Sequence, residues 1–140
     1  MRLPITVLTL LLAACGAPQP PVLVSELEIT KPMPGRHMSA GYFVITNNTD
    51  ESIHITSIVS PQFESVEIHE TTVTNGISRM RELDSLLVPA QSSVTLERGG
   101  KHLMLMRPRK LEDSVSLQIF AGDVPVLTVD YSFLSKGEEQ

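Results

Sequence analysis

The chain has 140 residues, 41% of them hydrophobic and 4% aromatic, and a formal net charge of −5 at pH 7. This length fits one domain that is large enough to bury a core. The acidic balance argues against a nucleic-acid partner and gives no reason to expect a basic membrane-binding patch. Because Cys15 is the only cysteine, an internal disulfide and a zinc–thiolate cluster are excluded.

The N-terminus resembles a bacterial lipoprotein signal. Arg2 supplies a positive start, and residues 5–12 form an apolar run that is far shorter than the ~20 residues needed to span a bilayer. The run ends in Leu-Ala-Ala-Cys at residues 12–15, which resembles a lipobox. We therefore expect residues 1–14 to be a signal peptide and Cys15 to be lipidated. A plain secreted protein with an unpaired thiol is the alternative.

The residues after the cysteine suggest a destination. Gly16 stands where an aspartate would signal retention in the inner membrane, so we expect the periplasmic side of the outer membrane. Residues 15–22 then form a lipidated cysteine and a proline-rich tether. A domain over residues 23–135 and a polar tail over residues 136–140 complete the expected organisation.

The domain has an apolar period of two almost throughout, which is typical of strands. No segment has a convincing helical period. Turn residues such as Asn75-Gly76 and Gly99-Gly100 separate the runs. The pattern predicts an all-β antiparallel sandwich or small barrel of about nine short strands, over residues 23–30, 42–46, 53–60, 65–72, 77–83, 92–97, 101–106, 114–120 and 126–133.

The apolar faces of these strands supply a core without any histidine or methionine. We expect this core to contain Leu27, Ile29, Phe43, Ile45, Val66, Ile68, Val94, Leu96, Leu103, Leu105, Leu117, Ile119, Leu127, Val129 and Tyr131. Histidines and methionines on the opposite faces therefore need another explanation.

A predicted hairpin brings one histidine and one methionine together. If Asn75-Gly76 is a two-residue turn, Thr74 pairs with Ile77, and His69 and Met80 become diagonal neighbours on the face opposite Ile68. A three-residue loop would reverse this parity.

The strand over residues 101–106 offers a second such pair. His102, Met104 and Met106 alternate on one face, with Leu103 and Leu105 on the other. Two histidines and two methionines make a neutral and soft ligand set, because thioethers suit Cu(I) and are poor ligands for Zn²⁺, Mg²⁺ or Ca²⁺. A blue-copper centre needs a cysteine ligand, and the only cysteine is assigned to the lipid.

These residues resemble a known family. His69, Met80, His102 and Met104 follow the spacing H-x10-M-x21-H-x-M of the periplasmic copper chaperones of the PCuAC type. The surrounding VEIHETT, RMREL and VPAQSSVTLERGGKHLMLM are similar as well, and the resemblance covers most of residues 25–133.

The resemblance implies a cupredoxin-like β-sandwich that binds one Cu(I) per chain through these four residues. We expect the protein to be monomeric. It also implies delivery to a respiratory oxidase centre of the CuA type, directly or through an assembly factor. A lipoprotein that buffers copper without a dedicated acceptor is the alternative. The tail SFLSKGEEQ lacks the His/Met-rich end of many members, so a second tail site is not expected.

His69, Met80, His102 and Met104 are called the quartet below. Each of the other residues near the quartet has two possible roles. Met106 is either an auxiliary ligand or a rim residue. Met33, His37 and Met38 lie in a predicted loop and either cap or load the copper or are ordinary loop residues. Glu67, Glu70 and Glu82 either orient an imidazole or face solvent. Four arginines either dock an acidic partner or are solvated: Arg79, Arg81, Arg107 and Arg109.

The remaining patterns give no further function. His54 alternates with two isoleucines, so we expect it to lie on the solvated surface. No nucleophile elbow, phosphate-binding loop or carboxylate pair for acid–base chemistry occurs. The sequence therefore indicates a binding protein and not an enzyme.

Overall fold

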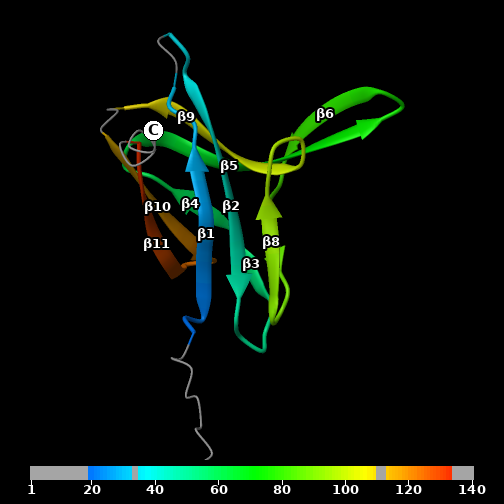
Figure 1. Ribbon diagram of the computed structural model, residues 1–140, viewed down its shortest axis with the longest axis vertical. Helices are drawn as coiled ribbons and strands as arrows, with labels where there is room; N and C mark the ends of the chain where they lie inside the picture. The colour runs from blue at the N-terminus through cyan, green and yellow to red at the C-terminus, as the bar shows by residue number, and fades with distance from the viewer. Residues whose placement is uncertain (1–18, 33–34, 110–112, 134–140) are drawn as a thin grey trace, which may run out of the picture.

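The computed structural model describes residues 19–32, 35–109 and 113–133, which form eleven strands and no helix (Figure 1). Among these residues there is thus no apolar helix of membrane-spanning length. The strands are β1 (Val22–Ile29), β2 (Met38–Asn47), β3 (Ile53–Ile55), β4 (Ser57–Val59), β5 (Phe63–Thr74), β6 (Ile77–Glu82), β7 (Leu86–Val88), β8 (Ser92–Leu96), β9 (Lys101–Pro108), β10 (Ser114–Ala121) and β11 (Val124–Ser132).

Three antiparallel sheets make up the fold. The largest has six strands in the order β1-β2-β9-β5-β6, with β8 also pairing with β2. The long strand β2 pairs with β9 through residues 38–41 and with β8 through residues 43–47. A three-stranded sheet, β11-β10-β4, and a two-stranded sheet, β3-β7, complete the sandwich.

The core contains the apolar faces that the strand pattern predicts. In β2, buried and half-buried residues alternate strictly, because successive side chains of a strand point to opposite faces. Leu103, Leu105, Leu117 and Ile119 are fully buried. All fifteen predicted core residues are either buried or packed against the buried cluster. The antiparallel β-sandwich is therefore confirmed.

The structure differs from the predicted strands most clearly in three places. The expected strand over residues 53–60 is wrong, because the chain changes sheets within it: β3 pairs with β7, and β4 pairs with β10. Thr56, at the change, donates its backbone N–H to Phe120 O at 3.0 Å. The three-residue strand β7 was missed, since so short a run shows no period. Met38, which the sequence pattern places in a loop, is the first residue of β2.

The β5–β6 hairpin has the predicted turn and register. Asn75 and Gly76 have φ values of 52° and 77°, the positive pair that a type I′ turn needs. Thr74 pairs with Ile77 and His69 with Glu82. In Figure 1 the hairpin extends beyond the neighbouring strands of its sheet.

Strands β2 and β9 approach each other closely at a glycine. Gly41 is the Cα partner of Leu103, and a Cβ added at Gly41 would lie 3.2 Å from the Leu103 Cβ. Glycine at this position thus lets Leu103 fill the core between the strands. On the opposite face, the next residue of β2, Ala40, lies beside Met104.

Candidate metal site

The register of β5 and β9 sets the two histidines side by side. His69 and His102 are Cα partners, and their ring centroids are 6.1 Å apart with an interplanar angle of 51°. Because Ile68 and Leu103 alternate with them and are buried in the core, both imidazoles lie on the outer face of the six-stranded sheet. One metal ion between the rings could contact a nitrogen from each.

The two methionines flank this pair of rings. Met104 is two residues from His102 on β9, on the same face. Met80 is the Cα partner of Thr71 on the hairpin, which makes it a diagonal neighbour of His69 at about 7–8 Å between backbones. The flexible thioether side chains are long enough to span such a distance. The four predicted ligands therefore share one face.

Backbone contacts fix the tautomer of His102. Its Nδ1 lies 3.0 Å from the carbonyl oxygen of Gly100, and because a carbonyl only accepts, Nδ1 carries the proton. The Nε2 lone pair of the neutral ring is then free to bind a metal. The same oxygen accepts the backbone N–H of Thr71 at 3.0 Å, so the glycine carbonyl joins the two strands beside the site.

A carboxylate fixes the ring of His69. Its Nε2 lies 2.9 Å from Glu67 Oε2, so Nε2–H donates to the carboxylate and the lone pair remains on Nδ1. That Nδ1 is buried and has no hydrogen-bond partner within the described part of the chain. A buried nitrogen of this kind is costly unless something satisfies it, and a metal ion bound at Nδ1 would do so.

The three nearby glutamates have different roles. Glu67 orients His69, as one of the two alternatives predicted. Glu82, which is exposed, has a carboxylate oxygen within 4.8 Å of ligand atoms of His69 and Glu67. Glu70 instead accepts from Arg81 at 2.8 Å and from Lys101 at 3.0 Å. These partners, Arg81 first, hold the pKa of the Glu70 carboxyl below its usual range, so Glu70 is occupied in ion pairing.

The structure places the possible auxiliary ligands in different environments. Met38 and Met106 are Cα partners on neighbouring strands, on the same face as Met104. His37 is exposed, and its carbonyl oxygen accepts from Arg107 N at 2.7 Å. Met33 and Cys15 lie outside the described residues, as does most of the predicted signal and tether. His54 is exposed on β3, as expected.

Two of the four arginines near the predicted ligands are engaged in ion pairs. Arg81 pairs with Glu70, and Arg107 donates from Nε to Glu64 at 2.7 Å. Sequence reasoning also missed one functional group, the Gly100 carbonyl that orients His102. The glycine pair before the strand was a signal of a turn, but nothing in the sequence marked its carbonyl as a histidine partner.

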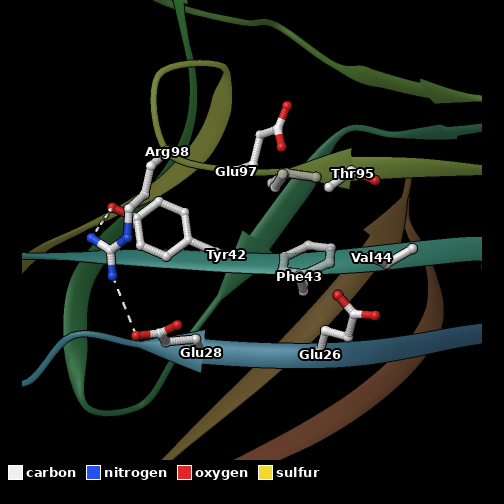
Figure 2. Close-up of a pocket in the computed structure, with 9 residues that line it drawn as sticks. Glu26, Glu28, Tyr42, Phe43, Val44, Thr95, Glu97 and Arg98 are labelled. Atoms are coloured by element: carbon white, nitrogen blue, oxygen red, sulfur yellow. Dashed lines mark hydrogen bonds and ion pairs between the residues drawn. The ribbon is translucent and has the colours of Figure 1, made fainter.

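A depression of about 260 Å³ lies elsewhere on the six-stranded sheet, between β1, β2 and β8. Figure 2 shows the Arg98 side chain over the Tyr42 ring, with the guanidinium carbon 4.5 Å from the ring centroid. Arg98 also donates to Glu28 at 3.3 Å. The arginine is thus engaged by the wall of the depression itself, and none of the four predicted metal ligands lines it.

Comparison with protein families matches residues 22–118 to the family described as "Putative lipoprotein LpqE-like". Because the match covers well over half of the chain, the protein belongs to the LpqE-like lipoprotein family. Two curated relatives share 31% and 33% identity over about half of the chain: an uncharacterized protein of Rickettsia prowazekii and "Putative lipoprotein Lxx21020" of Leifsonia xyli subsp. xyli. The aligned residues span only 40% and 44% of those proteins.

Solved structures of PCuAC proteins have the same fold. The copper-bound PCuAC domain from PmoF2 superimposes with a TM-score of 0.66 at 19% identity, covering 80% of this chain and 91% of the domain. The Cu(I) form of DR1885 from Deinococcus radiodurans gives a TM-score of 0.58 at 28% identity, covering 85% and 80%. The resemblance to the PCuAC type and the cupredoxin-like sandwich are thereby confirmed.

Proposed function

We propose that this protein is a lipid-anchored copper chaperone of the bacterial envelope, which binds one Cu(I) through His69, Met80, His102 and Met104 and passes it to an acceptor protein. The observation that carries the proposal is the pair of facing imidazoles, each with one nitrogen occupied by a hydrogen bond and the other available. Structural similarity to a Cu(I)-bound protein supports it.

The ligand chemistry selects the ion. Two neutral imidazoles and two thioethers add no negative charge, so they stabilise a monovalent soft cation better than a divalent hard one. The outer carboxylates Glu67 and Glu82 are the harder donors at this face. Since Glu67 is engaged by His69 Nε2, we assign it to orienting the ring and not to the metal.

Exposure gives the order in which ligands are exchanged. Met80 is 55% exposed on the hairpin, whereas His102 is 8% exposed. An incoming donor from another protein can therefore approach at Met80 first, while the histidines still hold the ion. An acceptor with better ligands, such as thiolates, then draws the copper away stepwise, and the ion is never released free.

The anchor and the acceptor are further parts of the proposal. Leu-Ala-Ala-Cys and the lipoprotein family support acylation at Cys15, and Gly16 favours the outer membrane in a Gram-negative envelope. The tether over residues 15–22 then holds the domain close to the membrane surface. The acceptor that we propose is a respiratory oxidase centre of the CuA type, directly or through an assembly factor.

The binding test uses the domain from residue 22 onward and a chromophoric Cu(I) chelator as competitor. We expect one tightly bound Cu(I) per chain, and loss of this binding when His102→Ala and Met104→Ala are combined. His54→Ala is the matched control, because His54 is exposed on β3 and is not one of the ligands. Equal affinity in the wild type and the double variant would contradict the proposed site.

The transfer test separates a chaperone from a copper buffer. The Cu(I)-loaded domain is mixed with a reduced apo CuA domain, and copper in each protein is measured after separation. Movement of copper to the CuA domain supports delivery. Retention of copper by a protein that binds it tightly would instead favour buffering without a dedicated acceptor, the alternative function.

A further inference from the structure

Three methionines adjoin one another on the outer face of the sheet, one step along the strands from the histidines. Met104 and Met106 alternate on β9, with the fully buried Leu103 and Leu105 on the core face. Met38 on β2 is the Cα partner of Met106. The proposed quartet uses Met104 but leaves Met38 and Met106 without a role.

Their spacing allows the three sulfur atoms to converge. Directly opposed residues have Cβ atoms about 4.5–5.5 Å apart, and residues two apart on one strand are separated by about 6.8 Å. The fourth position of this square is Ala40, the Cα partner of Met104. Its methyl group is much smaller than the three methionine side chains, so it takes up little of the space between them.

Burial also favours a binding role over simple core filling. Met38 is 49% exposed, and Met106 and Met104 are only half-buried. The core behind them is already filled by Leu105 and Leu103, so these methionines contribute little to it. On β5, the neighbours of Met106 and Met104 are Ser65 and Glu67, which bond to each other at 3.4 Å.

We propose that Met38, Met104 and Met106 form a second, all-thioether position for Cu(I). Thioethers are soft and uncharged, so such a position takes Cu(I) or Ag(I) and rejects Zn²⁺ and Cu²⁺. Without an imidazole it holds the ion more loosely than the quartet. Because Met104 belongs to both sets, an ion entering at the exposed Met38 can move to the histidines by exchanging one ligand at a time.

The test isolates this position by removing the quartet's nitrogen ligands. In the His69→Ala/His102→Ala variant, methionine methyl groups labelled with ¹³C are followed by NMR during titration with Ag(I), a redox-inert substitute for Cu(I). We expect the Met38, Met104 and Met106 methyl signals to shift together and the Met80 signal to stay in place. Preserved methyl dispersion before silver is added shows that the variant is folded.

Two further variants decide the outcome. Met38→Leu/Met106→Leu conserves side-chain volume, and we expect it to weaken the remaining Ag(I) affinity tenfold or more. Met80→Leu in the same background is the matched control and should leave that affinity unchanged. The proposal would be overturned if Met38→Leu/Met106→Leu left the remaining Ag(I) affinity unchanged. It would also be overturned if only the Met80 and Met104 methyl signals shifted on titration.

The same variants distinguish this proposal from the proposed function. In a protein with both histidines, Met38→Leu/Met106→Leu should leave the one-to-one Cu(I) affinity of the quartet within a factor of a few. If the quartet did not bind copper, the His69→Ala/His102→Ala variant would bind Cu(I) as tightly as the wild type. That result would not depend on whether Met38, Met104 and Met106 bind an ion. The two ideas therefore fail on different measurements.

Discussion

Strand β9 and the β5–β6 hairpin each supply a histidine and a methionine to the face that we assign to copper, but they are built differently. In β9, His102 is 8% exposed and its neighbour Leu103 is fully buried. On the hairpin, Val73, Ile77 and Met80 are 67%, 58% and 55% exposed. The contrast indicates that the core fixes His102, whereas Met80 on the hairpin is open to an incoming partner.

This contrast suits a protein that must both hold and release an ion. Ligands that are anchored by a packed core keep their geometry without the metal. A ligand on an exposed hairpin can be replaced without unfolding anything. Four substitution experiments test whether the two elements differ in this way.

The largest effect is expected on stability. Leu103→Ala leaves a cavity behind His102, and we expect the free energy of unfolding to fall by about 2–5 kcal/mol. Val73→Ala on the hairpin removes an exposed side chain and should change it by less than about 0.5 kcal/mol. Urea unfolding of both variants measures the difference. Similar losses would show that the hairpin is as much a part of the core as β9.

The second effect is on Cu(I) affinity. His102→Ala removes the buried ligand, and we expect a loss larger than the ~10–100-fold that an outer-shell partner contributes. Met80→Leu removes the exposed ligand and should cost about tenfold, or about 1.4 kcal/mol. Competition with a chromophoric chelator measures both constants. Equal losses would remove the proposed distinction between an anchored and an exchangeable half.

The third effect concerns the orientation of His69. Glu67→Gln keeps the shape of the side chain but replaces the charged carboxylate that accepts from His69 Nε2 with a neutral amide. We expect about tenfold weaker Cu(I) binding. Glu64→Gln is the matched control, because Glu64 lies on the same strand and pairs with Arg107 instead. An unchanged affinity for the Glu67 variant would mean that Glu67 does not orient His69 for the metal.

The smallest effect is expected at the hairpin turn. Gly76 has a φ of 77° with open space around it, so Gly76→Ala should cost about 1 kcal/mol through backbone strain alone. Gly122→Ala strains the β10–β11 turn in the same way, at φ 61°. We expect similar unfolding energies but weaker copper binding for Gly76→Ala only. Identical copper affinities would show that the turn does not position Met80.

Much of the fold and half of the site's geometry were predictable from local signals. The alternation of Leu103 and Leu105 with His102 and Met104 defines two faces by itself, since a strand has a period of two. Asn75-Gly76 predicts a two-residue turn, and this turn fixes the register that places Met80 beside His69. The spacing of His69, Met80, His102 and Met104 along the chain is the basis of the resemblance to PCuAC proteins. The assignment of the four ligands remains a prediction that the copper titrations test.

Other features depend on contacts between distant segments, which sequence pattern does not encode. Asn47, the last residue of β2, is a polar residue that is fully buried. Its Nδ2 donates to Glu51 O at 2.7 Å and to Val88 O at 3.2 Å, joining β2 to the missed strand β7. The division of residues 53–60 between two sheets likewise depends on which distant strands pair with each part.

The sequence encodes the faces of the strands, the turn of the hairpin and the set of soft ligands, because these follow from local chemistry and spacing. The local pattern does not encode that His69 faces His102, that Glu67 and the Gly100 carbonyl leave one nitrogen of each ring available, or that Met38 lies beside Met106. These pairings come from the antiparallel order β2-β9-β5, which is set by the packing of a shared core and not by any one segment.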